Sequence, residues 1–193
     1  MIVTLSGVTG IGKSFFKNLI IRELGFKNMV INTTREKRFN EINNIDKNFL
    51  SNEEFDNLKK QNKIAVDFEF LGNKYAYNVS DLQSDTNQVT EVHYSTIYEF
   101  KKNAKDVFSV YILPKDLEIA KTALYKRKLS PEVEKARLKE IDEHIKEFSQ
   151  NKGLQSQFDY IFTNNYDKKS KQELLNAIRE KLNRRKEKVW EKK

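Results

Sequence analysis

Eight residues near the amino end have the types and the spacing of a loop that binds phosphate. They fit the pattern G-x-x-x-x-G-K-[ST] and are Gly7, Val8, Thr9, Gly10, Ile11, Gly12, Lys13 and Ser14. Glycines let the backbone curl so that N–H groups point at a phosphate, and the start of a following helix adds partial positive charge. In such a loop the lysine reaches the β- and γ-phosphates and the serine hydroxyl binds Mg²⁺. The pattern predicts a nucleoside triphosphate site that uses all eight residues.

The elements on either side of this loop are those that it needs. Residues 2–6 form a short apolar, β-branched run, which predicts a buried strand. Residues 13–24 carry Phe15, Phe16, Leu19 and Ile20 at helical spacing, and Gly25 is a plausible C-cap. A chance glycine turn before a lysine is the alternative, and this strand–loop–helix context argues against it.

The rest of the chain predicts strands that alternate with helices. Further strands are expected at residues 29–33, 64–71, 74–79, 88–94, 107–113 and 158–163, and residues 34–48 read as a loop. Helices are expected from the Ser51 capping box to residue 61, and over residues 95–103, 116–127, 132–148 and the basic C-terminal segment. This alternation predicts an α/β fold, a parallel sheet covered by helices on both faces. The hairpin through Gly72-Asn73 interrupts it and predicts a small antiparallel insertion.

Composition excludes several kinds of site. The 193 residues contain no Cys, which rules out disulfides, thiolate metal sites and a Cys nucleophile. His93 and His144 lie far apart in the sequence and suggest no metal cluster. No apolar run approaches the roughly 20 residues of a membrane span, and no signal peptide precedes the first strand. We therefore expect a soluble, cytoplasmic protein without a membrane partner.

The positive charge is concentrated at the carboxyl end. Residues 168–193 contain 11 Lys or Arg and 4 Glu, and so account for +7 of the net charge of +8. These residues flank Leu174, Leu175, Ile178 and Leu182 at helical spacing. The pattern predicts an amphipathic helix with a solvated outer face, and a nucleic-acid partner is not expected from the charge alone.

Five further motifs follow the phosphate loop in a fixed order. They are T-T-R-E-K-R at residues 33–38, N-F-L-S-N-E-E-F at 48–55, G-N-K-Y at 72–75, Y-I-L-P at 111–114 and F-D-Y-I-F-T-N at 158–164. In this order and spacing the chain resembles the guanylate kinase family from about residue 2 to residue 180.

The resemblance implies a P-loop nucleotide kinase in a single domain, residues 1–193. Its core would comprise residues 1–31, 79–121 and 139–193, with a monophosphate-binding insertion at 32–78 and a helical lid at 122–138. The implied reaction moves the γ-phosphoryl group of ATP, bound with Mg²⁺, to a nucleoside monophosphate, by family a GMP-like acceptor. A monomer and a homodimer both remain open.

The resemblance also assigns roles to single residues. Arg35, Arg38 and Tyr75 match family residues that bind the acceptor phosphate, and Lys47 stands where the family has a further tyrosine. Asn164 is placed with the ATP-binding residues. The best matches to the catalytic lid arginines, which act beside Lys13, are Arg127 and Arg137, with Lys126 and Lys128 as alternatives to Arg127.

The base pocket departs from the family pattern. An ungapped alignment puts Val66 where the family has its guanine-reading glutamate; Asp67 or Glu69 takes that place only after a shift of register. Tyr77 replaces a small hydroxyl residue and His93 replaces an acid, while Glu91 keeps a position near Mg²⁺ with Ser14. Two alternatives to an active kinase therefore remain open: a binding module without phosphoryl transfer, and another P-loop ATPase or nucleic-acid 5′-kinase.

Overall fold

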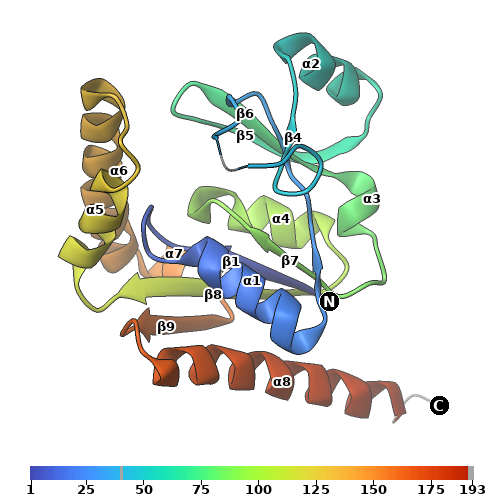
Figure 1. Ribbon diagram of the computed structural model, residues 1–193. Helices are drawn as coiled ribbons and strands as arrows, with labels where there is room; N and C mark the ends of the chain where they lie inside the picture. Colours follow the sequence, from blue (N-terminus) through green and yellow to red (C-terminus); the bar gives the residue numbers. More distant parts are fainter. Residues whose placement is uncertain (40, 191–193) are drawn as a thin grey trace.

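A five-stranded parallel sheet forms the centre of the molecule. The computed structural model describes residues 1–39 and 41–190 (Figure 1). In spatial order the strands are β2 (Lys27–Asn28), β7 (Gln88–Glu91), β1 (Ile2–Ser6), β8 (Val107–Pro114) and β9 (Tyr160–Asn164). Every neighbouring pair is parallel. The predicted α/β fold with a parallel sheet is confirmed.

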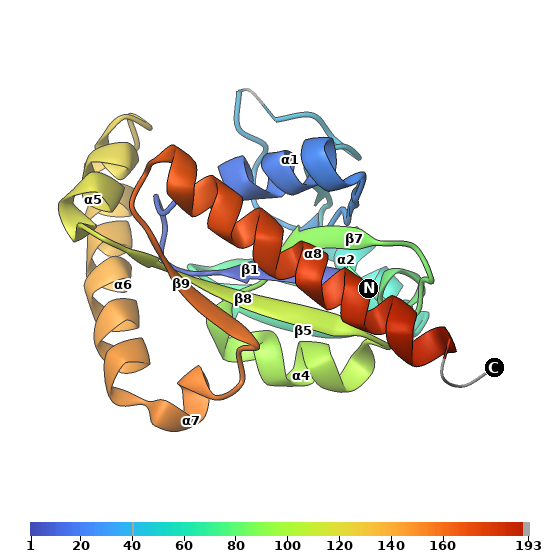
Figure 2. The ribbon, with the colours of Figure 1, turned by 90° about the horizontal axis from the view of Figure 1, so that it is seen from below.

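Helices cover both faces of this sheet, so its central strands β1 and β8 are buried along most of their length. The helices α1 (Lys13–Leu24) and α8 (Lys168–Trp190) lie side by side over one face, as Figure 2 shows from below. Against the other face pack α4 (Ile97–Asn103) and the short α7 (Lys152–Gln155). Alternate side chains of β8 divide between the faces, with Val110 and Ile112 toward α1 and α8 and Tyr111 toward α4 and α7.

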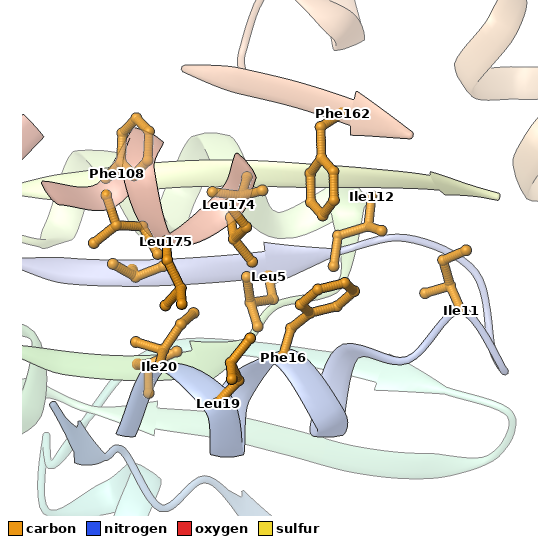
Figure 3. Packing of buried hydrophobic residues seen from close by; sticks show 14 of the residues in the cluster. Leu5, Ile11, Phe16, Leu19, Ile20, Phe108, Ile112, Phe162, Leu174 and Leu175 are labelled. Carbon is orange, nitrogen blue, oxygen red and sulfur yellow. The ribbon is translucent and has the colours of Figure 1, made fainter. Parts of the chain in front are cut away.

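The core beneath α1 and α8 explains the pattern of the C-terminal segment. Leu174, Leu175 and Ile178 of α8 are buried with Leu5 of β1 and Ile20 of α1 (Figure 3). The basic residues of the same helix, among them Arg179 and Arg184, are exposed. The predicted amphipathic helix is therefore confirmed, and its apolar face closes the core.

Replacing Leu174 by Ala is expected to lower the free energy of unfolding by about 2–5 kcal/mol, because the side chain is fully buried and its removal leaves a cavity. Urea denaturation of the two proteins measures the difference. Arg184→Ala, on the exposed face of α8, is the matched control and should stay within about 0.5 kcal/mol of wild type. Equal stability of Leu174→Ala and wild type would mean that α8 is not part of the core.

A second, mixed sheet stands beside the carboxyl ends of the central strands. Its order is β4 (Asn48–Phe49), β3 (Asn32–Thr33), β6 (Asn73–Asn78) and β5 (Ile64–Phe70). The predicted hairpin is the antiparallel pair β5–β6, closed by Leu71 and Gly72 at φ 49° and 71°, which is the backbone of a type I′ turn. Helix α2 (Asn52–Lys60) packs nearby and begins with the predicted capping box of Ser51 and Glu54.

Four further helical elements complete the fold. They are α3 (Val79–Leu82), the 3₁₀ turn η1 (Tyr94–Thr96), α5 (Leu117–Tyr125) and α6 (Pro131–Gln150). Ser130 caps α6 by accepting a hydrogen bond from the Val133 N–H, and Pro131 is the first residue of the helix. Helices α5 and α6 stand together at the left of Figure 1. In the part of the chain that the structure describes, no helix is long and apolar enough to cross a membrane.

Five expected boundaries were wrong. The apolar run 29–33 is not one strand: β2 and β3 belong to different sheets, and Met29 and Ile31 are buried in the bend between them. The loop expected over 34–48 ends in β4, and β6 gives way to α3 at Val79. Strand β7 ends at Glu91, and β9 begins at Tyr160. The residues of the bend at 29–33 are apolar because they are buried, and they do not form one continuous strand.

Candidate active site

One cavity contains most of the residues that the sequence singled out. Its volume is about 310 Å³, and it lies where β1 and β7 end, between the hairpin β5–β6 and the helices α5 and α6. Ligands of open α/β sheets bind at this edge. The predicted site residues that line it are Gly7, Thr9, Gly10, Gly12, Lys13, Ser14, Arg35, Arg38, Lys47, Tyr75, Tyr77, Glu91, His93, Arg127 and Arg137.

The phosphate loop is held in a conformation that requires its glycines. Gly7, Gly10 and Gly12 have φ of 137°, 86° and 97°. A Cβ at Gly10 would collide with the carbonyl oxygen of Ala120, so the loop passes directly against α5. Val8 and Ile11 are fully buried and do not line the cavity. They anchor the loop in the core while the glycines expose its backbone.

The side chain of Lys13 folds back onto the beginning of the phosphate loop. Its Nζ donates to the carbonyl oxygens of Gly7 at 2.8 Å and Val8 at 2.9 Å. Burial lowers the pKa of Lys13, and the carboxylates of Glu91 and Glu140 act against that shift. The ammonium group is thus kept at the floor of the cavity, where a bound polyphosphate would replace the loop carbonyls as its partner.

Ser14 and Glu91 form a pair that fits Mg²⁺. The Ser14 hydroxyl donates to Oε1 of Glu91 at 2.7 Å. Burial alone would raise the pKa of Glu91, but Lys13, Lys47, Lys17 and Ser14 together hold it below its usual range, so the carboxylate is ionised. A hydroxyl and a carboxylate are oxygen ligands of the kind that Mg²⁺ takes, with phosphate oxygens and water completing the shell. Among the described residues, no three His, Cys, Asp or Glu gather into a metal site.

Arg35 and Arg38 both contact the carboxylate of Glu41, a residue to which the sequence analysis gave no role. Nη2 of Arg35 lies 2.8 Å from both oxygens of Glu41, and the backbone N–H of Arg38 donates to the same carboxylate at 2.9 Å. Burial would raise the pKa of Glu41, and the two arginines lower it by more. The ring of Phe49 lies 5.4 Å from the Arg35 guanidinium. Glu41 and Phe49 therefore fix Arg35 at the cavity wall.

The lid contributes two more guanidinium groups. Arg127 and Arg137 both line the cavity, and the Arg137 guanidinium lies 4.9 Å above the ring of Phe70. Burial is the main cause that lowers the pKa of both, and the nearby charge of Arg38 adds to it. Lys126 and Lys128, the alternatives, are not among the described residues that line the cavity. Crowded cations of this kind fit a ligand with several negative charges.

At the far end of the cavity, the structure corrects the role expected for Val66. Its side chain is 5% exposed, packs in the second core cluster and does not line the cavity. Phe68 and Phe70, on the same face of β5, line it instead. Asp67 bonds to Lys59 at the surface, 2.6 Å away, which argues against a shifted register. Of the described β5 residues, no carboxylate reaches the cavity.

Tyr77 and Tyr75 stiffen this wall. Val66 pairs with Tyr77 and Phe68 with Tyr75 across the hairpin. Tyr77 is buried, its hydroxyl donates to the carbonyl oxygen of Glu91 at 2.8 Å, and burial raises its pKa. Tyr75 and Phe68 stack with their centroids 5.2 Å apart. At the position where the family has a small hydroxyl residue, this chain therefore has Tyr77, whose hydroxyl is hydrogen-bonded to the backbone of Glu91.

Several residues of this end were missed in the sequence. They are Phe68, Phe70, Tyr94, Glu140 and His144, all of which line the cavity. His144 stacks on Tyr94 at 3.6 Å, bonds through Nε2 to the Tyr111 hydroxyl at 2.9 Å, and lies 6.1 Å from His93 between ring centroids. In the sequence, the spacing of Arg137, Glu140 and His144 could have indicated that these residues share one face of a helix.

Asn164 supports the phosphate loop from behind. Its Nδ2 donates to the carbonyl oxygen of Ile11 at 3.0 Å, and its Oδ1 accepts from the Tyr166 N–H at 2.8 Å. The side chain is buried outside the cavity lining. A direct contact between Asn164 and ATP therefore stays a prediction, whereas the structure shows that Asn164 contacts the phosphate loop.

Comparison with known proteins agrees with this geometry. The family model described as guanylate kinase matches residues 1–181. The guanylate kinase of Mycoplasma mobile is 29% identical over 198 residues, covering 94% of this chain and 93% of the relative. That of Malacoplasma penetrans is 26% identical over 189 residues, with coverages of 94% and 93%.

The fold is similar to a solved structure as well. The crystal structure of guanylate kinase from Anaplasma phagocytophilum aligns with a TM-score of 0.68 at 22% identity, covering 94% of this chain and 85% of that chain. Since the family model spans nearly the whole chain, from the phosphate loop to α8, the chain belongs to the guanylate kinase family of ATP-dependent nucleoside monophosphate kinases.

Proposed function

We propose that this protein transfers the γ-phosphoryl group of ATP to GMP in a reaction that requires Mg²⁺. The observation that carries the proposal is the convergence, in one cavity, of the phosphate loop with Lys13 and of four arginines from two other segments, Arg35, Arg38, Arg127 and Arg137. The named guanylate kinases that match over most of this chain support GMP as the acceptor.

Each group of residues has a distinct part in the proposed reaction. Lys13 and the loop N–H groups would hold the ATP phosphates, and Ser14 and Glu91 would hold Mg²⁺. When bound, the metal would neutralise negative charge on the phosphates. Arg35, Arg38, Lys47 and Tyr75 would hold the acceptor phosphate in line for attack. Positioning and electrostatic stabilisation account for most of the catalysis in phosphoryl transfer.

The lid arginines complete the site. Arg127 lies in the segment that joins α5 to α6, Arg137 lies in α6, and both line the cavity. In that position they would neutralise charge on the phosphoryl group as it moves from donor to acceptor. Such groups contribute when the lid is closed over both substrates, and closure also excludes water.

An assay of ADP release with ATP, Mg²⁺ and a panel of monophosphates tests the proposal. The panel comprises GMP, dGMP, AMP, CMP, UMP and TMP. We expect release that depends on the acceptor and is fastest with GMP. Release without any acceptor dependence would instead favour an ATPase, and a lack of turnover with bound ATP would favour a binding module. The complete loop with Lys13 and Ser14 argues against the binding module.

Replacing Arg35 or Arg38 by Ala is expected to raise the KM for GMP by about 10–100-fold, because each change removes charge-assisted hydrogen bonds to the acceptor phosphate. The KM for ATP should stay within about twofold, since Lys13 and the loop hold the donor. Steady-state kinetics with each substrate varied in turn measures both. Arg22→Ala, exposed on α1 and paired with Glu23, is the control. An equal loss for ATP would place these arginines on the donor side.

A further inference from the structure

Three residues that line the cavity each carry a buried polar atom without a hydrogen-bond partner among the described residues. The atoms are Nε2 of His93, Oε2 of Glu140 and Nδ1 of His144. Nδ1 of His144 lies 3.4 Å from Oε1 of Glu140. Buried polar atoms in folded proteins are almost always bonded, so such exceptions call for a missing partner. A ligand in the cavity is the natural source of one.

The contacts of His93 make its Nε2 a donor. Nδ1 of His93 accepts from the backbone N–H of Ser95 at 3.4 Å and lies 2.8 Å from the Ser95 hydroxyl. A ring nitrogen that accepts a hydrogen bond carries no proton, so the His93 ring is in its neutral form. In a neutral ring whose Nδ1 accepts, the proton is on Nε2. His93 therefore offers one N–H to a ligand.

Glu140 offers the opposite chemistry. Its Oε1 lies 3.4 Å from Nδ1 of His144, an electrostatic contact that leaves Oε2 free. Burial would raise the pKa of Glu140, but His144, Lys13 and Arg137 act against burial and hold the pKa below its usual range. An ionised carboxylate only accepts hydrogen bonds. The cavity thus presents a donor and an acceptor from two different elements, η1 and α6.

Aromatic rings that pack on one another form the cavity wall beside this pair. Phe70 lies 4.8 Å from His93 between ring centroids, and Phe68 lies 5.6 Å from it. On α6, Arg137 precedes Glu140 by three residues and lies over Phe70. One helix face therefore carries a cation for phosphate and, one turn later, a carboxylate for a more distant group. A nucleotide has the same order of groups, with its phosphate at one end and its base at the other.

We propose that Glu140 and His93 read the acceptor base, with Glu140 accepting from the N1–H and 2-amino group of guanine and His93 donating to its O6. This inference rests on the proposed function, which supplies the acceptor. Guanine sets two donors side by side next to a carbonyl oxygen, whereas adenine sets one amino group beside a ring nitrogen acceptor. In this chain the carboxylate comes from the lid side, on α6, because β5 directs Val66 into the core and Phe68 and Phe70 into the cavity.

Calorimetric titration of the full chain with GMP, AMP and ATP tests this assignment. Glu140→Gln keeps the shape of the side chain and removes its charge. We expect the Kd for GMP to rise by about 10-fold or more, and the Kd values for AMP and ATP to change by less than about threefold. Glu143→Gln removes the same charge three residues later on the exposed side of α6, where Glu143 pairs with Lys139, and should leave all three values unchanged.

The outcomes separate the inference from the proposed function. Unchanged GMP affinity in Glu140→Gln, or an equal loss for GMP and AMP, would overturn the role of Glu140 in base reading. If that variant fails to fold, His93→Phe keeps the aromatic packing, and a selective loss of GMP affinity of up to about 10-fold supports the same pair, whereas no selective loss overturns it. Wild-type protein that binds GMP selectively through Glu140 but releases no ADP would contradict the kinase proposal alone.

Discussion

Replacing Lys13 by Ala is expected to reduce kcat for phosphoryl transfer by about 10²–10³-fold or more, while the fold persists. A preorganised donor aimed at developing charge typically contributes this much. The Nζ of Lys13 is fixed by the Gly7 and Val8 carbonyls at the point where the ATP phosphates would lie. Removing it deletes a charge from the cavity floor and no apolar contact from the core clusters.

Steady-state kinetics with saturating ATP and GMP gives the change in kcat, and thermal denaturation shows whether the variant is folded. Lys27→Ala, which removes an exposed lysine from β2, is the matched control and should retain full activity. Turnover of folded Lys13→Ala at the wild-type rate would show that the phosphate loop does not take part in phosphoryl transfer. A variant that binds ATP normally but turns over slowly would locate the effect in the transition state.

The central sheet was predictable because local and global signals agree there. The run 2–6 is apolar, the loop glycines come directly after it, and the helix they open has a regular apolar stripe. Local and global signals also agree in α8, where Leu174 and Ile178 are buried and basic residues such as Arg179 and Arg184 are exposed to solvent. Where several levels of pattern point to one structure, sequence reasoning is reliable.

The boundaries that failed are places where tertiary contacts decide. Met29 and Ile31 are as apolar as strand residues, yet they fill the bend through which the chain passes from one sheet to the other. His93 continues an apparent strand in sequence, but its ring accepts from the Ser95 N–H and starts a 3₁₀ turn. A period of two cannot distinguish a paired strand from a buried connection.

The residues at the phosphate end of the site could be predicted from the sequence, whereas those at the other end of the cavity could not. Phosphate recognition uses glycines and cations in short, local motifs, so the loop, Arg35 and Arg38 stood out. The side chains that we propose for base recognition lie near β5, at the start of η1 and on α6, and they are distant from one another in sequence. Glu140 and His144 look like ordinary residues of a charged helix until the fold places them beside His93.

The second large effect is expected at the lid. Replacing Arg137 by Met should reduce kcat by about 10³-fold with the Kd for ATP unchanged, since a guanidinium that reaches the transferring phosphoryl group contributes roughly this much or more in comparable enzymes. Methionine retains an unbranched apolar stem against Phe70, over which the Arg137 guanidinium lies at 4.9 Å. The variant therefore tests the charge more than the packing.

Single-turnover kinetics and ATP titration separate the possible roles of this arginine. A loss confined to kcat means that Arg137 acts in the transition state, whereas a rise in the KM for GMP at constant kcat would place it with Arg35 and Arg38 in acceptor binding. Lys135→Met, an exposed change two residues earlier on α6, is the control for the loss of one lid charge. Because Arg137 and Glu140 share one face of α6, Arg137→Met should slow every acceptor alike, whereas Glu140→Gln should act on GMP selectively. That difference would show that one helix serves both ends of the acceptor nucleotide.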